Sequence, residues 1–249
     1  MTDGQETTGT FFDHLRQAEQ PTGAGLRWTR RAFERMLTFA EAAPGSRILE
    51  IGPGRGGLAE LCLARKMEYH AVEPNAELAE SLRHKGAHVV CARVPPLPAL
   101  DGTFDLVAMV NVMEHMNGLE QALDTACQVR RVLQPGGRFL IHSPDYLSWR
   151  SHFFNCDFSH NYVTTRRRLD QLLVNAGYDG IRSGYMSGPF RGAAAVLVSA
   201  LASHLPFGAL EALAPDCPVC RRLYKLQLTF SRRILILGRN PSHEPDPAR

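Results

Sequence analysis

The fold is decided by the stretch from Arg47 to Gly57, which reads RILEIGPGRGG. Its first five residues are mostly aliphatic and predict a buried strand, and glycines follow at positions 52, 54 and 56. Such glycines let the backbone turn sharply and lie close to a ligand, because no Cβ atom intervenes. The helix expected from Gly57 directs its N-terminal amides toward the same place. The stretch therefore predicts a ligand-binding turn between a strand and a helix.

An acidic residue stands where the partner of such a turn is expected. Glu73 ends a second predicted strand, roughly twenty residues after the glycines, and a carboxylate there can accept hydrogen bonds from both hydroxyls of a ribose. What sets the stretch apart from the dinucleotide motif GxGxxG is Glu50, two residues before the first glycine. A carboxylate at that position suits a positively charged ligand better than a pyrophosphate. We expect an adenosine-type cofactor that carries a positive charge.

Three further motifs follow the glycine loop in order. They read LPALDGTFDLV from 97 to 107, VMEH from 112 to 115 and RVLQPGG from 131 to 137. With these motifs, residues 26 to 182 resemble the class I S-adenosylmethionine-dependent methyltransferases of the broad ubiquinone-methylase-like and natural-product group. The resemblance implies transfer of a methyl group from S-adenosyl-L-methionine to oxygen or nitrogen of a natural-product, sugar or lipid-linked intermediate, with S-adenosyl-L-homocysteine as product. Two alternatives stay open: another enzyme on the same fold that uses an S-adenosyl or nucleotide ligand, and a non-catalytic cofactor-binding module.

The middle of the chain alternates predicted strands and helices. This order predicts a doubly wound α/β fold, with a mostly parallel sheet of seven strands and helices on both faces. We expect a flexible segment or lid over residues 1–25, a methyltransferase domain over 26–239 with a helical insert at about 189–229, and a disordered tail over 240–249. The strands are expected at 47–51, 68–73, 87–91, 104–110, 137–142, 181–187 and 230–237, and the helices at 26–42, 57–65, 75–85, 118–133 and 164–176.

Composition limits the class of protein. The chain has 249 residues and a net charge of +3, which is too small to require a nucleic-acid partner. Six scattered cysteines and the lack of a secretory segment favour the cytoplasm. The longest apolar run, near 193 to 201, is too short to span a bilayer. Cys217 and Cys220 have the spacing of half a zinc site, but no second pair lies nearby, so we expect no metal.

The cofactor should contact residues that follow the first four strands. In this family an Asp usually follows the third strand and accepts the adenine amino group, but Arg93 stands there and cannot accept a hydrogen bond. The amino group then needs a backbone carbonyl or water, with Ala92 and Arg93 beside the ring. The predicted cofactor-binding residues are Glu50, Gly52, Gly54, Gly56, Glu73, Pro74, Ala92, Arg93 and Asn111.

Three residues are candidates for catalysis. Methyl transfer needs proximity and exclusion of water, and a base helps when the acceptor must lose a proton. His115 is the first candidate base, with Glu114 to orient it, and His160 is the second. Structural roles stay open: Glu114 and His115 could cap a helix, and His160 could bond to the backbone.

The acceptor is expected beyond the fifth strand and near the insert. The predicted substrate-binding residues are Asp145, Trp149, Phe154 and Tyr162. The insert combines apolar residues with a basic group (Arg221, Arg222, Lys225, Arg232 and Arg233). This combination suits an anionic membrane surface or a lipid-linked substrate, while an acceptor-site cap or a homodimer contact predicts the same residues.

Overall fold

The computed structural model describes residues 23–241, so most of the predicted lid and tail lies outside the described residues. The strands are β1 Arg47–Ile51, β2 Glu68–Val72, β3 His88–Val90, β4 Phe104–Val110, β5 Leu133–Pro144, β6 Asp179–Ser187, β7 Phe190–Arg191 and β8 Arg233–Arg239. The helices are α2 Gly23–Phe39, α3 Gly57–Ala64, α4 Ala76–His84, η1 Met113–His115, α5 Leu119–Val132, α6 Tyr146–Trp149, α7 His152–Asn155, α8 Arg166–Asn175, α9 Ala193–Ser203, α10 Phe207–Leu213 and α11 Pro218–Phe230.

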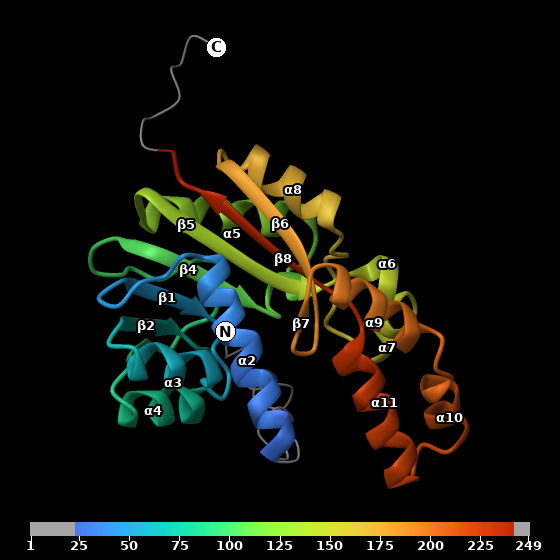
Figure 1. Cartoon of the computed structure of the whole chain (residues 1–249). Coiled ribbons are helices and arrows are strands. Elements are labelled where there is room, and N and C mark those ends of the chain that lie inside the picture. Colours follow the sequence, from blue (N-terminus) through green and yellow to red (C-terminus); the bar gives the residue numbers. More distant parts are fainter. Residues whose placement is uncertain (1–22, 242–249) are drawn as a thin grey trace, which may run out of the picture.

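The strands form one sheet in the order β3-β2-β1-β4-β5-β8-β6-β7 (Figure 1). Strands β1 to β5 pair in parallel, and β8 lies antiparallel between β5 and β6. The predicted α/β class and mostly parallel sheet are confirmed. The predicted number of seven strands is wrong among the described residues, because the two-residue β7 pairs with β6 as an eighth.

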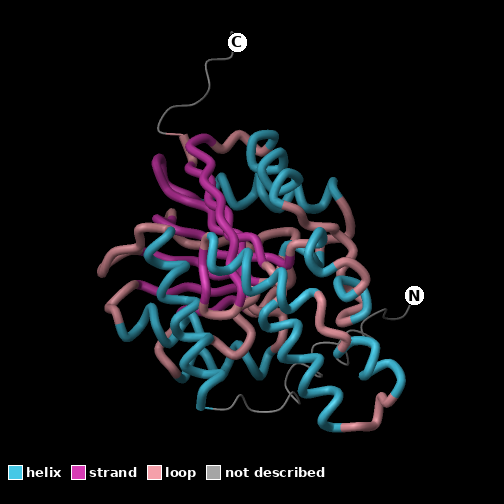
Figure 2. Tube along the Cα trace, turned by 45° about the vertical axis from the view of Figure 1, so that its right-hand side comes forward, coloured by secondary structure: helices cyan, strands magenta, loops and turns pink. Residues whose placement is uncertain are grey.

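Helices cover both faces of the sheet, as the alternation of elements requires (Figure 2). One face packs against α5 and α8, whose buried residues include Ala126, Val129 and Leu169. The other packs against α2, α3 and α4, through residues such as Leu37 and Leu58. Since both faces of the sheet are covered, the exposed functional surface is at the ends of the strands.

The boundary between the last helix and the last strand differs from the one that the sequence predicts. Phe230 was expected to begin the final strand, but it ends α11, and β8 begins at Arg233. The ring of Phe230 contacts Trp28 of α2 at a centroid distance of 5.3 Å, edge to face. This aromatic contact holds Phe230 outside the sheet, so the apolar run from 230 to 237 is shared between a helix and a strand.

Helices α9, α10 and α11 form the predicted insert and lie together beside the end of the sheet (Figure 1). The stretch Ala193–Leu213 is long and apolar enough to cross a membrane by length and composition alone, with a mean hydropathy of 1.7. The prediction of too short a span concerned only the run near 193–201, which lies within the 11 residues of α9. The stretch is nevertheless two helices, because α9 ends at Ser203 and α10 starts at Phe207, after Pro206.

Candidate functional site

The carboxyl ends of β2, β1 and β4 bring the predicted cofactor residues together. These strands are neighbours in the sheet, and Gly52, Glu73 and Asn111 each follow one of them directly. The amide of Gly52 donates to the carbonyl of Val72 at 2.9 Å, so the glycine loop begins beside the end of β2. In a parallel sheet, ligands bind at the carboxyl ends of the strands.

Glu73 lies against the glycine loop. The amide of Gly54 donates to its Oε2 at 3.0 Å, and the amide of Asn75 donates to its Oε1 at 2.9 Å. Burial raises the pKa of Glu73, while these two backbone hydrogen bonds oppose the shift. Each carboxylate oxygen has a further lone pair, so Glu73 can still accept the ribose hydroxyls that the sequence assigns to it.

The loop glycines have positive φ angles, and their surroundings differ. A Cβ atom on Gly52 would lie 2.7 Å from Val112 Cγ2, and one on Gly56 would lie 2.3 Å from Leu82 Cδ2. Gly54, at φ +54°, has nothing within 4 Å of the same position. The protein therefore packs against two of the glycines and leaves open space beside the third. Open space next to the Glu73 carboxylate fits a bound adenosine derivative.

Glu50 is buried within β1, two residues before Gly52. The hydroxyl of Tyr69 donates a hydrogen bond to Glu50 Oε2. Burial raises the pKa of Glu50 to about 7, with the hydrogen bond from Tyr69 lowering it and the charge of Glu73 adding to the rise. A nearby cation would favour the ionised form of Glu50. Its contact with a charged cofactor stays a prediction.

The adenine side of the predicted site is placed by the ends of β2 and β3. The amide of Glu73 donates to the carbonyl of Val90 at 3.1 Å, and the thiol of Cys91 lies 3.7 Å from the carbonyl oxygen of Pro74. Ala92 and Arg93 follow at once in the chain. Pro74 thus lies beside Cys91, directly before Ala92 and Arg93 in the chain, and the contacts of all three predicted residues with the cofactor stay predictions.

Asn111 joins the cofactor loop to the rest of the site. It has a φ of +53°, which is uncommon for a residue other than glycine, and its amide donates to the carbonyl of His142 at 2.8 Å. The backbone then enters η1, whose preceding residue Val112 packs against Gly52. Such strained conformations persist where the surrounding structure imposes them, often beside ligands.

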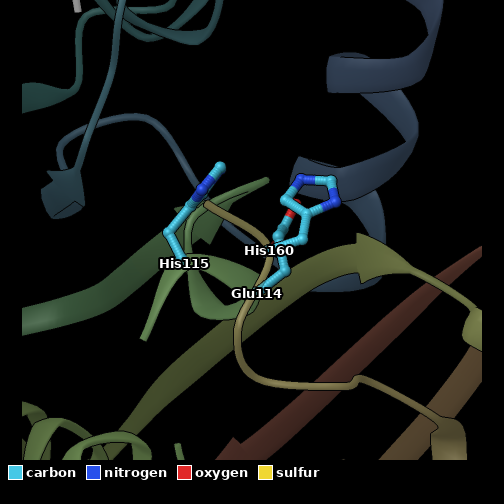
Figure 3. A group of neighbouring side chains, drawn as sticks. All are labelled: Glu114, His115 and His160. Carbon is cyan, nitrogen blue, oxygen red and sulfur yellow. The ribbon is translucent and has the colours of Figure 1, made fainter. Parts of the chain in front are cut away.

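The three candidate catalytic residues meet in space (Figure 3). One potential ligand atom each of Glu114, His115 and His160 lies within 4.8 Å of the other two. Glu114 and His115 come from η1, and His160 comes from the segment between α7 and α8. The amide of Tyr162 donates to the carbonyl of Glu114 at 3.0 Å and holds that segment against η1.

Hydrogen bonds fix each member of this cluster. His115 Nδ1 lies 2.6 Å from Ser159 Oγ, and His160 Nδ1 lies 2.6 Å from the carbonyl oxygen of Phe153. Ser143 Oγ donates to Glu114 Oε2 at 2.8 Å. Burial lowers the pKa of both imidazoles and raises the pKa of Glu114 to about 7. The shift of the imidazole pKa values favours the neutral form of both histidines.

Among the described residues, none of the four predicted substrate-binding residues lines the cavity of about 1000 Å³ at α2 and α11. Asp145 is fully buried, caps α6 and forms an ion pair with Arg232 at 2.8 Å. Trp149 is buried and donates from Nε1 to the carbonyl of Arg232 at 2.8 Å. Tyr162 is buried in the core, while Phe154 is half exposed. The structure gives Asp145 and Trp149 roles in holding α6, because these polar groups are satisfied within the protein.

A cavity of about 1000 Å³ lies elsewhere, between α2, α11 and the ends of β4, β5 and β8. Three basic residues line it, and no carboxylate does so among the described residues. Burial and the charge of Arg233 lower the pKa of His142 to about 3, so this histidine is also neutral. The sequence analysis did not assign His142 to a pocket, but it left open an acceptor-site cap that includes the three basic residues, Arg222, Lys225 and Arg233. The spacing of Arg222, Lys225 and Thr229 by three and four residues, which places them on one helical face, was the available signal.

Known proteins share both the sequence pattern and the fold. A family model described as a methyltransferase domain matches residues 12–183. The chain belongs to this methyltransferase domain family. The prediction that it resembles S-adenosylmethionine-dependent methyltransferases is thereby confirmed, and with it the assignment as an enzyme of this class and the cofactor.

Individual relatives of this methyltransferase domain differ in what their names say they act on. The chain is 32% identical to the ubiquinone/menaquinone biosynthesis C-methyltransferase of Rubrivivax gelatinosus over 157 residues, which is 60% of the chain and 57% of that protein. It is 27% identical to the malonyl-[acyl-carrier protein] O-methyltransferase of Enterobacter lignolyticus over 82% of both chains. Against several other curated relatives the chain spans only 25% to 41% of their length.

A solved structure supports the fold. A methyltransferase of Haloferax volcanii, determined in complex with the Trm112 activator, superposes with a TM-score of 0.65 at 16% identity, over 93% of this chain and 98% of that one. At this level of identity the likeness concerns the arrangement of the sheet and helices. The acceptor of the present methyltransferase domain has to be inferred from its own cavity.

Proposed function

We propose that the protein transfers a methyl group from S-adenosylmethionine to an oxygen or nitrogen atom of an anionic, partly apolar small molecule. The observation that carries this proposal is the position of Asn111. It follows the strand that leads into the cofactor side of the site, and it also lines the cavity of about 1000 Å³. A donor and an acceptor bound on either side of Asn111 would meet at the carboxyl end of β4, where a reaction between them can occur.

The residues proposed to hold the cofactor are those around the glycine loop. Glu73 would accept the ribose hydroxyls, and Gly54 leaves the space that the ligand needs. Bound S-adenosylmethionine supplies a methyl group on a positively charged sulfur, which is electrophilic without further activation. Glu50 carries the carboxylate nearest the start of the loop and is proposed to face the positive end of the ligand.

The cavity supports an anionic acceptor. Arg222, Lys225 and Arg233 bring positive charge to its lining, and an anion such as a carboxylate or phosphate would offset their desolvation. Trp28 and Phe33 of α2 provide an apolar wall for the rest of the molecule. Pockets of this size with few polar groups on an apolar lining are typical of small-molecule sites.

Activation of the acceptor is assigned to the cluster of Glu114, His115 and His160. Val112 packs against Gly52, so η1 lies directly beside the cofactor loop. His115 is only partly buried, whereas Glu114 and His160 are buried, so the cluster opens on the His115 side. His115 remains the first candidate for the group that accepts the acceptor's proton.

We further propose that α9 and α10 rest on an anionic bilayer and that the acceptor is lipid-linked. The exposed face of α9 has no charged residue, and Leu197 and Leu201 are 64% and 66% exposed. Segment 190–230 contains four basic residues and two acidic ones, which favours an anionic surface. Helix α11 supplies both exposed basic residues and part of the cavity wall, so the surface and the cavity adjoin. The cytoplasmic location also remains a proposal, and all six cysteines are free thiols.

The acceptor proposal can be tested with paired compounds. Radiolabelled methyl transfer from S-adenosylmethionine is measured to amphipathic hydroxy acids and to their neutral amides. We expect transfer to the acids, and Arg222→Gln should raise KM for them by about tenfold, the loss of one charge-assisted contact. Arg221→Gln is the matched control, because Arg221 is on the same helix but does not line the cavity. Equal use of acids and amides by the unmodified protein would refute an anionic acceptor.

A further inference from the structure

The proton positions on the two histidines of the cluster follow from their partners. His160 Nδ1 faces the carbonyl oxygen of Phe153, which can only accept, so Nδ1 carries the hydrogen. Ser159 Oγ donates its one hydrogen to Asp157 Oδ1 at 2.7 Å, so His115 Nδ1 must donate to Ser159. His160 therefore presents the lone pair of Nε2, while His115 donates from Nδ1 and also has the backbone of Asn111 as a hydrogen-bond partner. Metal-binding histidines are oriented in this way, with the other ring nitrogen donating to an oxygen.

Glu114 supplies a second and independent observation. Its side chain is fully buried, Oε2 accepts from Ser143, and Oε1 has no hydrogen-bond partner. Arg233 acts on this carboxylate through its charge, but its Nη1 donates to the carbonyl of Thr229 at 3.1 Å. A buried carboxylate oxygen without a partner is costly, and native structures usually provide one. A cation beside Oε1 would provide it.

We infer that Glu114, His115 and His160 form a binding site for a divalent transition-metal cation. The ligand atoms lie within 4.8 Å of one another, so small side-chain rotations would bring them to a shared ion (Figure 3). Two imidazoles and one carboxylate are a ligand set used for iron, manganese and zinc. Asp157 behind Ser159 adds a negative charge to the outer shell. The partly exposed side of His115 leaves room for water or another oxygen ligand.

This inference rests on the proposed methyl transfer for its chemical role. An acceptor hydroxyl in the remaining coordination position becomes more acidic and releases its proton to solvent water. Its oxygen forms the bond to the methyl carbon, and the electron pair of the breaking carbon–sulfur bond stays on sulfur. His115 and His160 then act as ligands, and the cation takes over the activation for which His115 was the first candidate. No oxidation or reduction is involved.

The separation of the ligands in the sequence hid this site. Glu114 and His115 are adjacent, but His160 follows 45 residues later, beyond β5 and α7. Adjacent Glu and His residues alone do not resemble a metal motif, and only the packing of the 157–162 segment against η1 brings in the third ligand. The prediction of no metal rested on Cys217, which directly precedes α11, and Cys220 on α11, and both are outside this cluster.

The test is a titration of the chelator-treated full chain with Co²⁺, followed by visible absorption and calorimetry. We expect one cation per chain, with d–d bands in the visible and no thiolate charge-transfer band. His160→Ala and Glu114→Gln should abolish this binding, and Ser159→Ala should weaken it by about ten- to a hundredfold, as for outer-shell partners. His204→Ala, on the exposed insert, is the matched control and should bind as the unmodified protein does.

Binding of S-adenosylhomocysteine is measured in the same samples, which separates the two proposals. A chain that binds S-adenosylhomocysteine but no Co²⁺ overturns the metal inference and leaves the proposed function intact. Co²⁺ binding that survives in His160→Ala but is lost when Cys217 and Cys220 are replaced by serine would also overturn the metal inference. A chain that binds Co²⁺ as described but no S-adenosylhomocysteine refutes the proposed function and not the site.

Discussion

Glu73 is the side chain on which cofactor affinity should depend most directly. Its carboxylate is positioned by two backbone amides and is predicted to accept both ribose hydroxyls. Glu73→Ala should therefore weaken S-adenosylhomocysteine binding by about 2 to 4 kcal/mol in calorimetry, the value of two charge-assisted hydrogen bonds. Glu80→Ala removes an exposed carboxylate from α4 and should change nothing. An unchanged affinity in Glu73→Ala would remove Glu73 from the site.

Gly54 can be tested against a glycine of matching conformation. Gly54 and Gly45 both have positive φ angles, and neither has an atom within 4 Å of the position that a Cβ would occupy. Alanine at either position should cost about 1 kcal/mol of stability through backbone strain alone. Only Gly54→Ala should also lose S-adenosylhomocysteine binding, because its Cβ would occupy the space assigned to the ligand. If both variants bind normally, the ligand does not approach Gly54.

Because the pKa of the buried Glu50 carboxyl is raised, we expect the stability of the fold to depend on pH. Burial raises its pKa from 4.5 to about 7, so the folded chain holds this proton over a range in which the unfolded chain has lost it. Stability must then fall as pH rises from 4.5 to about 7, by about 3 kcal/mol for this group. Glu50→Gln should remove that loss, so urea denaturation should show the variant to be more stable than the unmodified protein at about pH 8 and similar to it at about pH 4. A variant less stable at both values would contradict this account.

Helix α9 is the element whose sequence is hardest to reconcile with exposure to water. The proposed bilayer contact predicts that the full chain sediments with phosphatidylglycerol vesicles and less with phosphatidylcholine vesicles. Replacing Leu197 and Leu201 by Gln should reduce vesicle binding on the order of a hundredfold, since two exposed leucines no longer enter the apolar layer. Leu119→Gln, which alters an equally exposed leucine on α5, is the control. If the unmodified chain instead self-associates and does not bind vesicles, and the double variant no longer self-associates, the exposed face of α9 is a dimer contact.

The parallel strands were the elements most predictable from sequence. β1 and β4 have the predicted bounds, because each is a short aliphatic run that ends at a glycine or polar turn. β5 begins at Leu133, earlier than predicted, although Pro135 and Gly136 indicate a turn. Leu133 pairs with Phe104 across an irregular register between β4 and β5. Such a contact between distant residues overrides the local turn signal and could not be predicted from composition.

The candidate site also has parts that could be predicted from the sequence and parts that could not. The glycine loop and Glu73 were predictable because a turn and an acid at fixed spacing have one simple physical explanation. The acceptor cavity was not, because α2 and α11 come from opposite ends of the chain and meet through Trp28 and Phe230. Asp145 was assigned to substrate for its position after β5, while its ion pair with Arg232 depends on the insertion of β8 next to β5. Pairings made by the antiparallel strand are long-range and leave no local pattern.

In the molecule as a whole, the glycine loop, the Glu114 cluster and the proposed acceptor cavity lie at the end of the sheet where the parallel strands have their carboxyl ends. Strands β2, β1 and β4 carry the cofactor residues, and β5 and β8 carry His142 and Arg233 on the acceptor side. Helix α2 covers the cavity from one side and α11 from the other. Asn111 belongs to both the proposed cofactor site and the proposed acceptor cavity, so the two proposed sites adjoin.

The measurement that tests this account most directly is thermal unfolding of the full chain with S-adenosylhomocysteine and, separately, with NAD. S-adenosylhomocysteine at about one hundred times its Kd should stabilise the folded chain by about 2.7 kcal/mol and raise Tm, because it binds only the folded state. NAD at the same concentration should leave Tm unchanged, since we expect the Glu50 carboxylate, two residues before the first loop glycine, to disfavour a pyrophosphate there. A rise in Tm with NAD and none with S-adenosylhomocysteine would contradict the assignment of the glycine loop to S-adenosylmethionine.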